Sequence, residues 1–183
     1  MSEPTPLLPP LKPKQVAARL WRHGALTPDD WQSVGDDEPL PITGRAIVTI
    51  ARWRGEQPAL VASGVPVGVK LGVGDALDPV ADDVQRLSLI ALPFPKFSDG
   101  RSYSTARRLR EAGYAGELRA TGDVLLDQVP LMLRAGFDAL EITHAATVAA
   151  LERGEIPAVP QIYQTGAERG AIAVTFKARP TRK

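Results

Sequence analysis

The sequence predicts an α/β fold: an open or partial-barrel, mainly parallel sheet of five to six strands built from short βα units. From Ile47 onward, short apolar runs alternate with amphipathic stretches, which is typical of buried parallel strands joined by helices. A small repeat supports this, because Glu111–Tyr114 before one expected strand resembles Arg134–Phe137 before the next, with the two glycines 23 residues apart. A closed eight-fold barrel needs about 250 residues, and this chain has 183. We therefore expect the sheet to stay open.

The amino-terminal residues are expected to form an extension of this sheet domain. Met1–Pro13 carries five prolines and lacks the basic-then-apolar order of a secretory signal. A helix is expected over Gln15–Arg22, and a loop over the Pro-, Gly- and Asp-rich stretch Val34–Pro41. Trp21 and Trp31 are expected to attach the extension to the main body. The expected divisions are a leader and extension over 1–45, an α/β domain over 46–176 and a basic tail over 177–183.

Five apolar runs are short enough to be strands buried in a parallel sheet. They are Ala46–Ile50, Val67–Leu71, Ser88–Pro93, Glu117–Ala120 and Ala139–Thr143. A weaker sixth strand is expected at Gln161–Tyr163.

Four helices are expected between and after these strands. The first begins with Asp78 as N-cap and Pro79 at the first helical position. The second covers Tyr103–Glu111, with Tyr103, Ala106 and Leu109 on one side, and ends before a glycine. The third covers Asp123–Arg134, where Pro130 removes a backbone donor and predicts a kink or a short turn before a second helix. The last helix lies between Thr143 and Gly154.

Composition excludes several classes of function. Lys and Arg number 22 against 21 Asp and Glu, which disfavours nucleic acid as a partner. Cysteine is absent, so disulfides, thiolate zinc sites and cysteine-ligated iron–sulfur clusters are excluded, and two distant histidines exclude a multi-histidine metal site. We expect no metal and no cofactor of the chain's own. No apolar run of about 18 residues occurs, so we expect no membrane span and a cytoplasmic protein.

Polar residues follow three of the expected strands, at the carboxyl edge of the sheet, where parallel α/β proteins usually have their catalytic and binding residues. This topology predicts that Lys96, Asp99, Arg101, Asp123 and His144 share one rim. The stretch from Lys96 to Ser104 combines cations, hydroxyls and a helix start. Lys96, Arg101 and Ser102 are therefore candidates for binding a sulfite, sulfate or phosphate group. The alternative is a capped surface loop whose basic residues pair with neighbouring carboxylates.

Three further residues carry alternatives that the sequence leaves open. Arg119 lies inside an expected strand, and is either an anion ligand or half of an internal ion pair. His144 is either a general acid or base beside a carboxylate, or the cap of a helix. Asp123 and Glu141 are the candidates for a general base.

Several segments together resemble one bacterial family. The segments are Phe94–Ser104, Ala106–Arg110, Gly113–Tyr114, Gly116–Ala120, Gly122–Leu125, Asp127–Gln128 and Gly136–Ala139. They look like the signature of the domain-of-unknown-function 934 proteins, over about residues 94–142. Genes of that family typically lie beside sulfite or nitrite reductase and phosphoadenylyl-sulfate reductase. The resemblance identifies which positions match the family but assigns no role to any of them. Among the matching positions, Asp99, Asp127 and Gln128 are expected to support the site.

Two functions from different classes follow. The first is an accessory protein or oxidoreductase component of assimilatory sulfate and sulfite reduction, which binds a sulfur oxyanion or one of those reductases as partner. The second is a stand-alone partial-barrel enzyme that acts on a phosphorylated or sulfonated small metabolite, with Arg101 and Arg119 holding the anion. Open sheet edges also make self-association an expectation.

Overall fold

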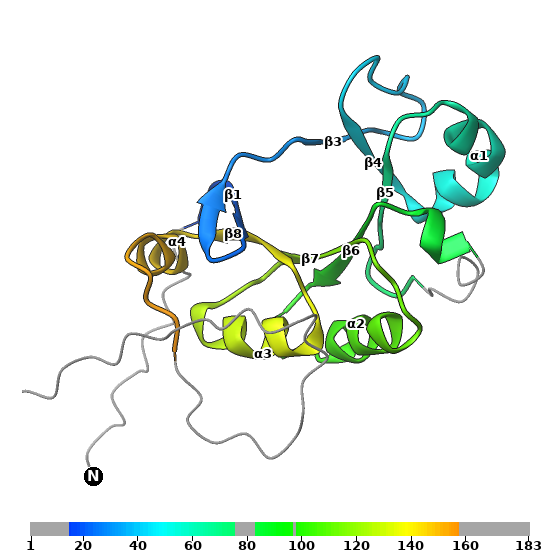
Figure 1. Cartoon of the computed structure of the whole chain (residues 1–183). Coiled ribbons are helices and arrows are strands. Elements are labelled where there is room, and N and C mark those ends of the chain that lie inside the picture. The colour runs from blue at the N-terminus through cyan, green and yellow to red at the C-terminus, as the bar shows by residue number, and fades with distance from the viewer. Residues whose placement is uncertain (1–14, 76–82, 97, 158–183) are drawn as a thin grey trace, which may run out of the picture.

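A computed structural model describes residues 15–75, 83–96 and 98–157, which contain one eight-stranded sheet in the order β2-β1-β8-β7-β6-β5-β4-β3 (Figure 1). The strands are β1 Gln15–Arg22, β2 Ala25–Thr27, β3 Trp31–Ser33, β4 Arg45–Thr49, β5 Val67–Lys70, β6 Leu89–Phe94, β7 Glu117–Gly122 and β8 Ala139–His144. The helices are α1 Ile50–Ala62, α2 Arg101–Glu111, α3 Val129–Ala135 and α4 Ala145–Glu152, with a 3-10 turn η2 at Leu126–Gln128.

The sheet is mostly parallel. Strands β3 to β8 lie side by side in chain order and are parallel, whereas β1 is antiparallel to both β8 and β2. Parallel strands that follow one another in chain order need crossovers of one hand, which places their helices on one face of the sheet. Helices α1 to α4 accordingly surround the outer side of the sheet in Figure 1.

The two edge strands are joined by a very short link, and this requires the sheet to curl. Eight strands at a spacing of about 4.8 Å would spread over roughly 34 Å if they lay flat. Only residues 28–30 separate β2 from β3, and four extended residue steps span at most about 14 Å. The edges must therefore approach each other, and the sheet forms a half-barrel with the link crossing its open side.

The main core lies between the outer face of the half-barrel and the helices. Alternation along β6 places Ile90, Leu92 and Phe94 in this core, each at most 1% exposed. The inner face has a smaller cluster around Trp31 and Leu89. Gly68 of β5 is part of that inner face, where a Cβ would lie 2.9 Å from the Leu89 Cβ and 3.1 Å from the Trp31 ring. Only glycine leaves room for the tryptophan there.

The five expected strands are confirmed as β4 to β8, but the sheet is larger than the predicted five to six strands. The expected helix over Gln15–Arg22 is wrong, because these residues form β1. Leu20 and Trp21 of β1 are buried between the ladders to β2 and β8, so tertiary pairing overrides the local pattern. Trp21 and Trp31 are buried, as expected. The weak strand at Gln161–Tyr163 lies outside the described residues.

The helix predictions differ in outcome. Residues 76–82, which hold the expected Asp78 cap, lie outside the described part of the chain, and residues 83–86 form a 3-10 turn. Helix α2 begins two residues before the expected position. The break at Pro130 is confirmed, because η2 is followed by α3 with the proline in its first turn. Helix α4 is confirmed. Within the described ranges, no helix is long and apolar enough to cross a membrane.

The sequence repeat corresponds to a repeated helix end. Gly113 and Gly136 have φ of 82° and 103°, in the left-handed region that favours glycine. The next residue in each unit, Tyr114 or Phe137, donates its backbone N–H to a carbonyl in the last turn of the preceding helix and packs in the core. Arg110 joins the two units, because its side chain donates to the carbonyls of Tyr114 and Gly136.

Candidate functional site

The carboxyl rim is defined here as the segments that follow β6, β7 and β8, namely residues 95–101, residues 123–128 and His144 with the start of α4. Phe94 and Gly122 are paired at the ends of β6 and β7, and the Asp123 backbone N–H donates to the Phe94 carbonyl at 2.7 Å. Gly122 has φ of 100°, and a Cβ there would lie 2.5 Å from the Phe94 oxygen. This close approach holds Asp123 directly above the end of the sheet.

A histidine and a carboxylate form the closest polar pair of the rim. His144 Nε2 lies 2.6 Å from Asp123 Oδ1, and the His144 ring is buried while Asp123 is partly exposed. A carboxylate only accepts hydrogen bonds, so the proton of this contact lies on Nε2. Nδ1 is also buried and faces no hydrogen-bond partner in the described residues. His144 occupies the N-cap position of α4, but its side chain makes no capping bond.

A tyrosine that the sequence analysis treated only as an apolar helix position also reaches the rim. The Tyr103 hydroxyl is buried with no hydrogen-bond partner among the described residues, and its ring packs edge-on against Phe94 at 5.0 Å. Burial, with a contribution from the Asp127 carboxylate, raises the pKa of Tyr103 to about 12. The hydroxyl therefore stays protonated at neutral pH. Gln128 supports the same loop, since its side chain accepts from the Leu125 backbone N–H.

The predicted anion ligands at the start of α2 are engaged within the chain. Arg101 Nη2 lies 2.6 Å from Asp99 Oδ2, and its Nε contacts both oxygens of that carboxylate. Arg101 lowers the pKa of the Asp99 carboxyl to about 2. Ser102 is buried, and its hydroxyl donates to the Pro93 carbonyl at 2.6 Å. Lys96 is exposed on the same loop. These contacts match the alternative to an anion site, namely a capped surface loop whose basic residue pairs with a neighbouring carboxylate.

Arg119 lies on the inner face of the half-barrel and not on the rim. Its guanidinium is 1% exposed and bonds both oxygens of Asp29, at 2.6 and 3.0 Å, and Glu117 at 3.0 Å. Burial lowers the pKa of Arg119, but the two carboxylates outweigh this effect and leave the pKa raised. Of the two interpretations of Arg119, an anion ligand or half of an internal ion pair, the structure therefore has the internal ion pair. Sequence reasoning missed Asp29 as the partner, because it lies 90 positions away in the β2–β3 link.

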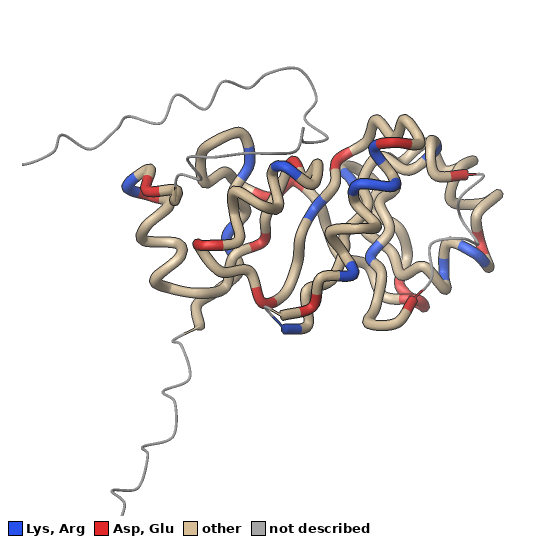
Figure 2. Tube along the Cα trace, turned by 90° about the horizontal axis from the view of Figure 1, so that it is seen from below, with Lys and Arg blue, Asp and Glu red and all other residues tan. Residues whose placement is uncertain are grey.

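The structure therefore separates residues that the sequence grouped together. Asp123 and His144 meet, whereas Arg101 and Arg119 are held by different carboxylates in different parts of the fold. Glu141 is partly buried on β8 opposite Leu20 of β1, and alternation places it on the inner face, away from the face that holds His144. Seen from below, basic and acidic positions are interspersed along the trace (Figure 2). The shared pocket expected for Arg101 and Arg119 is not formed.

The fold and the rim define an α/β half-barrel protein with a histidine–carboxylate pair at the carboxyl end of its parallel strands. A family model described as "Bacterial protein of unknown function (DUF934)" matches residues 68–172, more than half of the chain. The protein belongs to this family. The match begins in β5 and includes every rim residue described above. Among curated proteins, no significant match is found.

Proposed function

We propose that this protein is an accessory component of assimilatory sulfate and sulfite reduction, which works in the cytoplasm by docking its carboxyl rim onto a reductase. The pathway comes from the family resemblance, whose members are encoded beside sulfite or nitrite reductase and phosphoadenylyl-sulfate reductase. Because the chain has no cysteine and two distant histidines, electron transfer in this proposal belongs to the partner.

The pairing of Arg101 with Asp99 is the observation that favours a protein partner over a free oxyanion. Sulfite would have to displace a carboxylate that already makes a two-oxygen contact with the guanidinium. The Arg101 side chain is 68% exposed and the Asp99 side chain 18%, so the pair presents mainly its guanidinium to solvent. A partner surface with complementary charges can add to such a pair without breaking it.

The test uses growth and co-purification. Deleting the gene in a host without a second copy is expected to stop growth on sulfate and leave growth on cysteine normal. A tagged copy is expected to restore growth and to retain a reductase subunit. Normal growth of the deletion strain on sulfate would exclude the proposed pathway.

Two charge reversals on α2 then locate the docking surface. Arg101→Glu at the rim is expected to weaken reductase retention about tenfold or more, because it reverses an interfacial charge. Arg107→Glu is the matched control, since Arg107 is also exposed and ion-paired on α2 but lies beyond the middle of the helix, away from the rim residues at its start. Equal retention by both variants would show that the rim is not the docking surface.

The His144–Asp123 pair supports the second candidate, an enzyme acting on a phosphorylated or sulfonated metabolite. A carboxylate that orients an imidazole is a common arrangement in general acid–base catalysis. Inorganic sulfate, sulfite and phosphate serve as probes in thermal unfolding. The enzyme hypothesis expects a concentration-dependent rise in Tm that Arg101→Ala reduces, because Arg101 is its expected anion ligand. The absence of a rise with all three anions would favour the docking protein.

A further inference from the structure

The inner face of the half-barrel is closed at the amino end of its strands and opens toward the carboxyl end. At the amino end the β2–β3 link crosses the interior, where Asp30 pairs with Arg45, the first residue of β4. Exposure rises from there along β8, since Ala139 is 0% exposed whereas Glu141 and Thr143, further along the same face, are partly buried. A small molecule can therefore reach the inner face from the carboxyl end.

A lysine lies at this open end of the inner face without a partner. Lys70 is the last residue of β5 and is paired with Ala91, a member of the inner cluster, so its side chain is on the inner face. It is exposed and has no hydrogen bond or ion pair with any described residue. Arg119 lies on the other side of Ala91 in the same row and is neutralised by two carboxylates. Lys70 therefore presents the uncompensated positive charge of this row.

An unpaired carboxylate faces the same interior from β8. Glu141 stands between Leu140 and Ile142, which both pack in the main core, so alternation places its side chain on the inner face. It makes no hydrogen bond or ion pair within the described part of the chain. A carboxylate that is partly withdrawn from water normally has a partner, because its lost hydration must be replaced. Glu141 is therefore a candidate for contact with a ligand.

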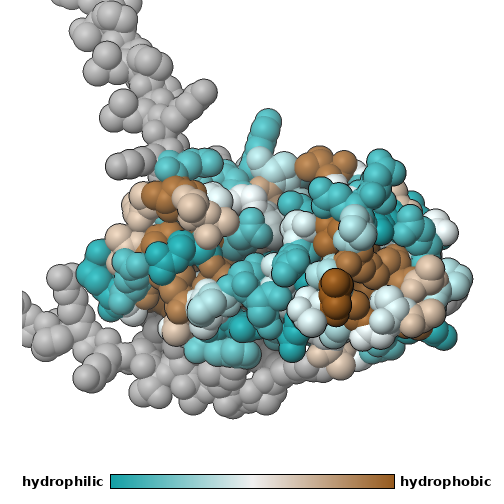
Figure 3. All heavy atoms as spheres, turned by 90° about the horizontal axis from the view of Figure 1, so that it is seen from above, coloured by the Kyte–Doolittle hydropathy of each residue, from teal (hydrophilic) through white to brown (hydrophobic). Residues whose placement is uncertain are grey.

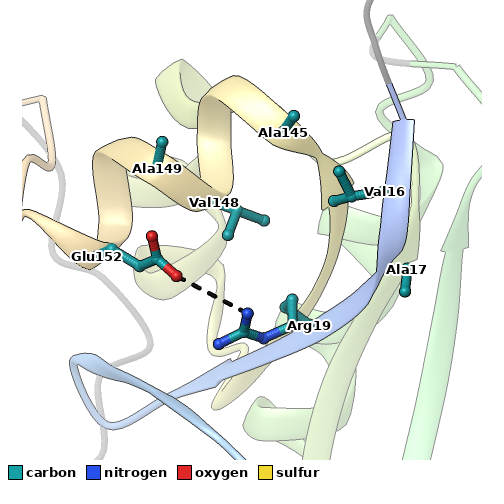
Figure 4. A pocket seen from close by; sticks show the side chains of 7 residues that line it. All are labelled: Val16, Ala17, Arg19, Ala145, Val148, Ala149 and Glu152. Carbon is teal, nitrogen blue, oxygen red and sulfur yellow. Dashed lines mark ion pairs between the residues drawn. The ribbon is translucent and has the colours of Figure 1, made fainter.

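The groove between β1 and α4 has no comparable free charge (Figure 4). Its volume is about 250 Å³, and its two charged side chains, Arg19 and Glu152, pair with each other at 3.8 Å. The remaining lining residues are valine and alanine. Seen from above, hydrophilic residues lie across the middle of the molecule, between apolar patches (Figure 3). The open end of the inner face is therefore better suited than the groove to bind a charged molecule.

We propose that Lys70 and Glu141 bind the two ends of a small zwitterionic ligand. A carboxylate or sulfonate group of the ligand contacts the Lys70 ammonium, and an ammonium group contacts the Glu141 carboxylate. A ligand of zero net charge matches one free cation and one free anion on the protein. Neither side chain belongs to the carboxyl rim, so this site does not depend on the proposed docking function.

The strand order sets the length of such a ligand. Strands β5 and β8 are three strand spacings apart, which is roughly 14 Å along the sheet. The curl of the sheet shortens the straight line between the two side chains, and the four-carbon stem of Lys70 spans part of what remains. The ligand therefore carries its two charges on a short carbon chain, as amino acids and aminosulfonates do.

NMR titration of the full chain with zwitterions of increasing length tests the proposal. The probes are glycine, β-alanine, γ-aminobutyrate, ε-aminocaproate and taurine. We expect saturable shifts of the Lys70 and Glu141 amide signals, strongest for one chain length. Lys70→Met and Glu141→Gln are each expected to raise the Kd of that probe about tenfold or more. Asp37→Asn is the matched control, since Asp37 is also a carboxylate without a contact among the described residues but lies in the exposed β3–β4 loop, and is expected to leave the Kd unchanged.

Probes with one charge separate the two ends of the site. Butylamine is expected to bind more weakly to Glu141→Gln but equally to Lys70→Met, and butyrate the reverse. Two results would overturn the proposal. The first is the absence of saturable shifts at Lys70 and Glu141 in the unchanged chain with all of the zwitterions, which does not depend on any variant folding. The second is a Kd that neither Lys70→Met nor Glu141→Gln changes, in variants with native circular dichroism.

Discussion

The ion pair between Arg119 and Asp29 holds the short link of the half-barrel against its inner face, and replacing Asp29 tests this role. Asp29→Ala removes two charge-assisted hydrogen bonds, at 2.6 and 3.0 Å, from a guanidinium that is 1% exposed. Breaking a buried pair by removing one partner costs about 3–5 kcal/mol. Two features lower the estimate here, since Asp29 is itself 37% exposed and Glu117 remains bonded to Arg119. We expect a loss of about 2–3 kcal/mol in the free energy of unfolding.

The neighbouring residue provides the control. Asp30 belongs to the same link, but it pairs with Arg45 at 3.5 Å and Arg22 at 4.0 Å and is 51% exposed. Asp30→Ala is therefore expected to cost less than about 1 kcal/mol. Urea unfolding followed by circular dichroism measures both variants, with an unchanged slope required for the comparison. Equal losses for the two variants would refute the assignment of Arg119 as a buried cation held by Asp29.

Three further predictions concern the rim and the helix ends. The Asp99 carboxyl is expected to titrate by NMR at about pH 2. The stability it contributes is present above its unfolded pKa and lost as pH falls through this value, and Arg101→Ala should return the midpoint to the ordinary range near 3.9. Tyr103 is expected to ionise at about pH 12 in ultraviolet difference spectra. Its neutral form stabilises the fold below pH 10, and this contribution is lost as pH rises through 12; a Tyr103→Phe variant that retains a transition of the same size near 12 would contradict the assignment. Gly122→Ala, which combines φ of 100° with a Cβ 2.5 Å from the Phe94 oxygen, should lower unfolding free energy by more than about 2 kcal/mol. Gly113→Ala has φ of 82° in open space and should cost only about 1 kcal/mol, so equal costs would show that the close approach has no effect.

The central part of the fold was predictable because its signals are local. Apolar runs of strand length, glycine after a helix and Pro130 in the first turn of α3 are each decided within a few residues of chain. The strand β1 was mistaken for a helix because its burial pattern is set by pairing with β8 and β2, and its first five residues are exposed. Helix α1 gave little local signal, since Gly55 and Pro58 lie inside it.

The candidate site was predictable only in part. The carboxyl ends of neighbouring parallel strands meet at one edge, so Asp123 and His144 could be placed together from the strand pattern. The partner of Arg119 could not, because nothing in the pattern around residue 119 indicates Asp29. The sequence grouped Tyr103 with the apolar residues on one side of its helix, and only the coordinates show that its hydroxyl is enclosed beside the rim.

By itself, the sequence determined the βα order of the central domain, its helix ends and the family to which the chain belongs. These properties follow from the periodicity of apolar residues and from residue types such as glycine and proline, which restrict or free the backbone at their own positions. Only the tertiary structure decided that the sheet curls into a half-barrel and that Arg119 is neutralised by Asp29 of the β2–β3 link together with Glu117. The physical reason is that closure, register and ion pairing depend on residues brought together over long stretches of chain, which local periodicity does not record.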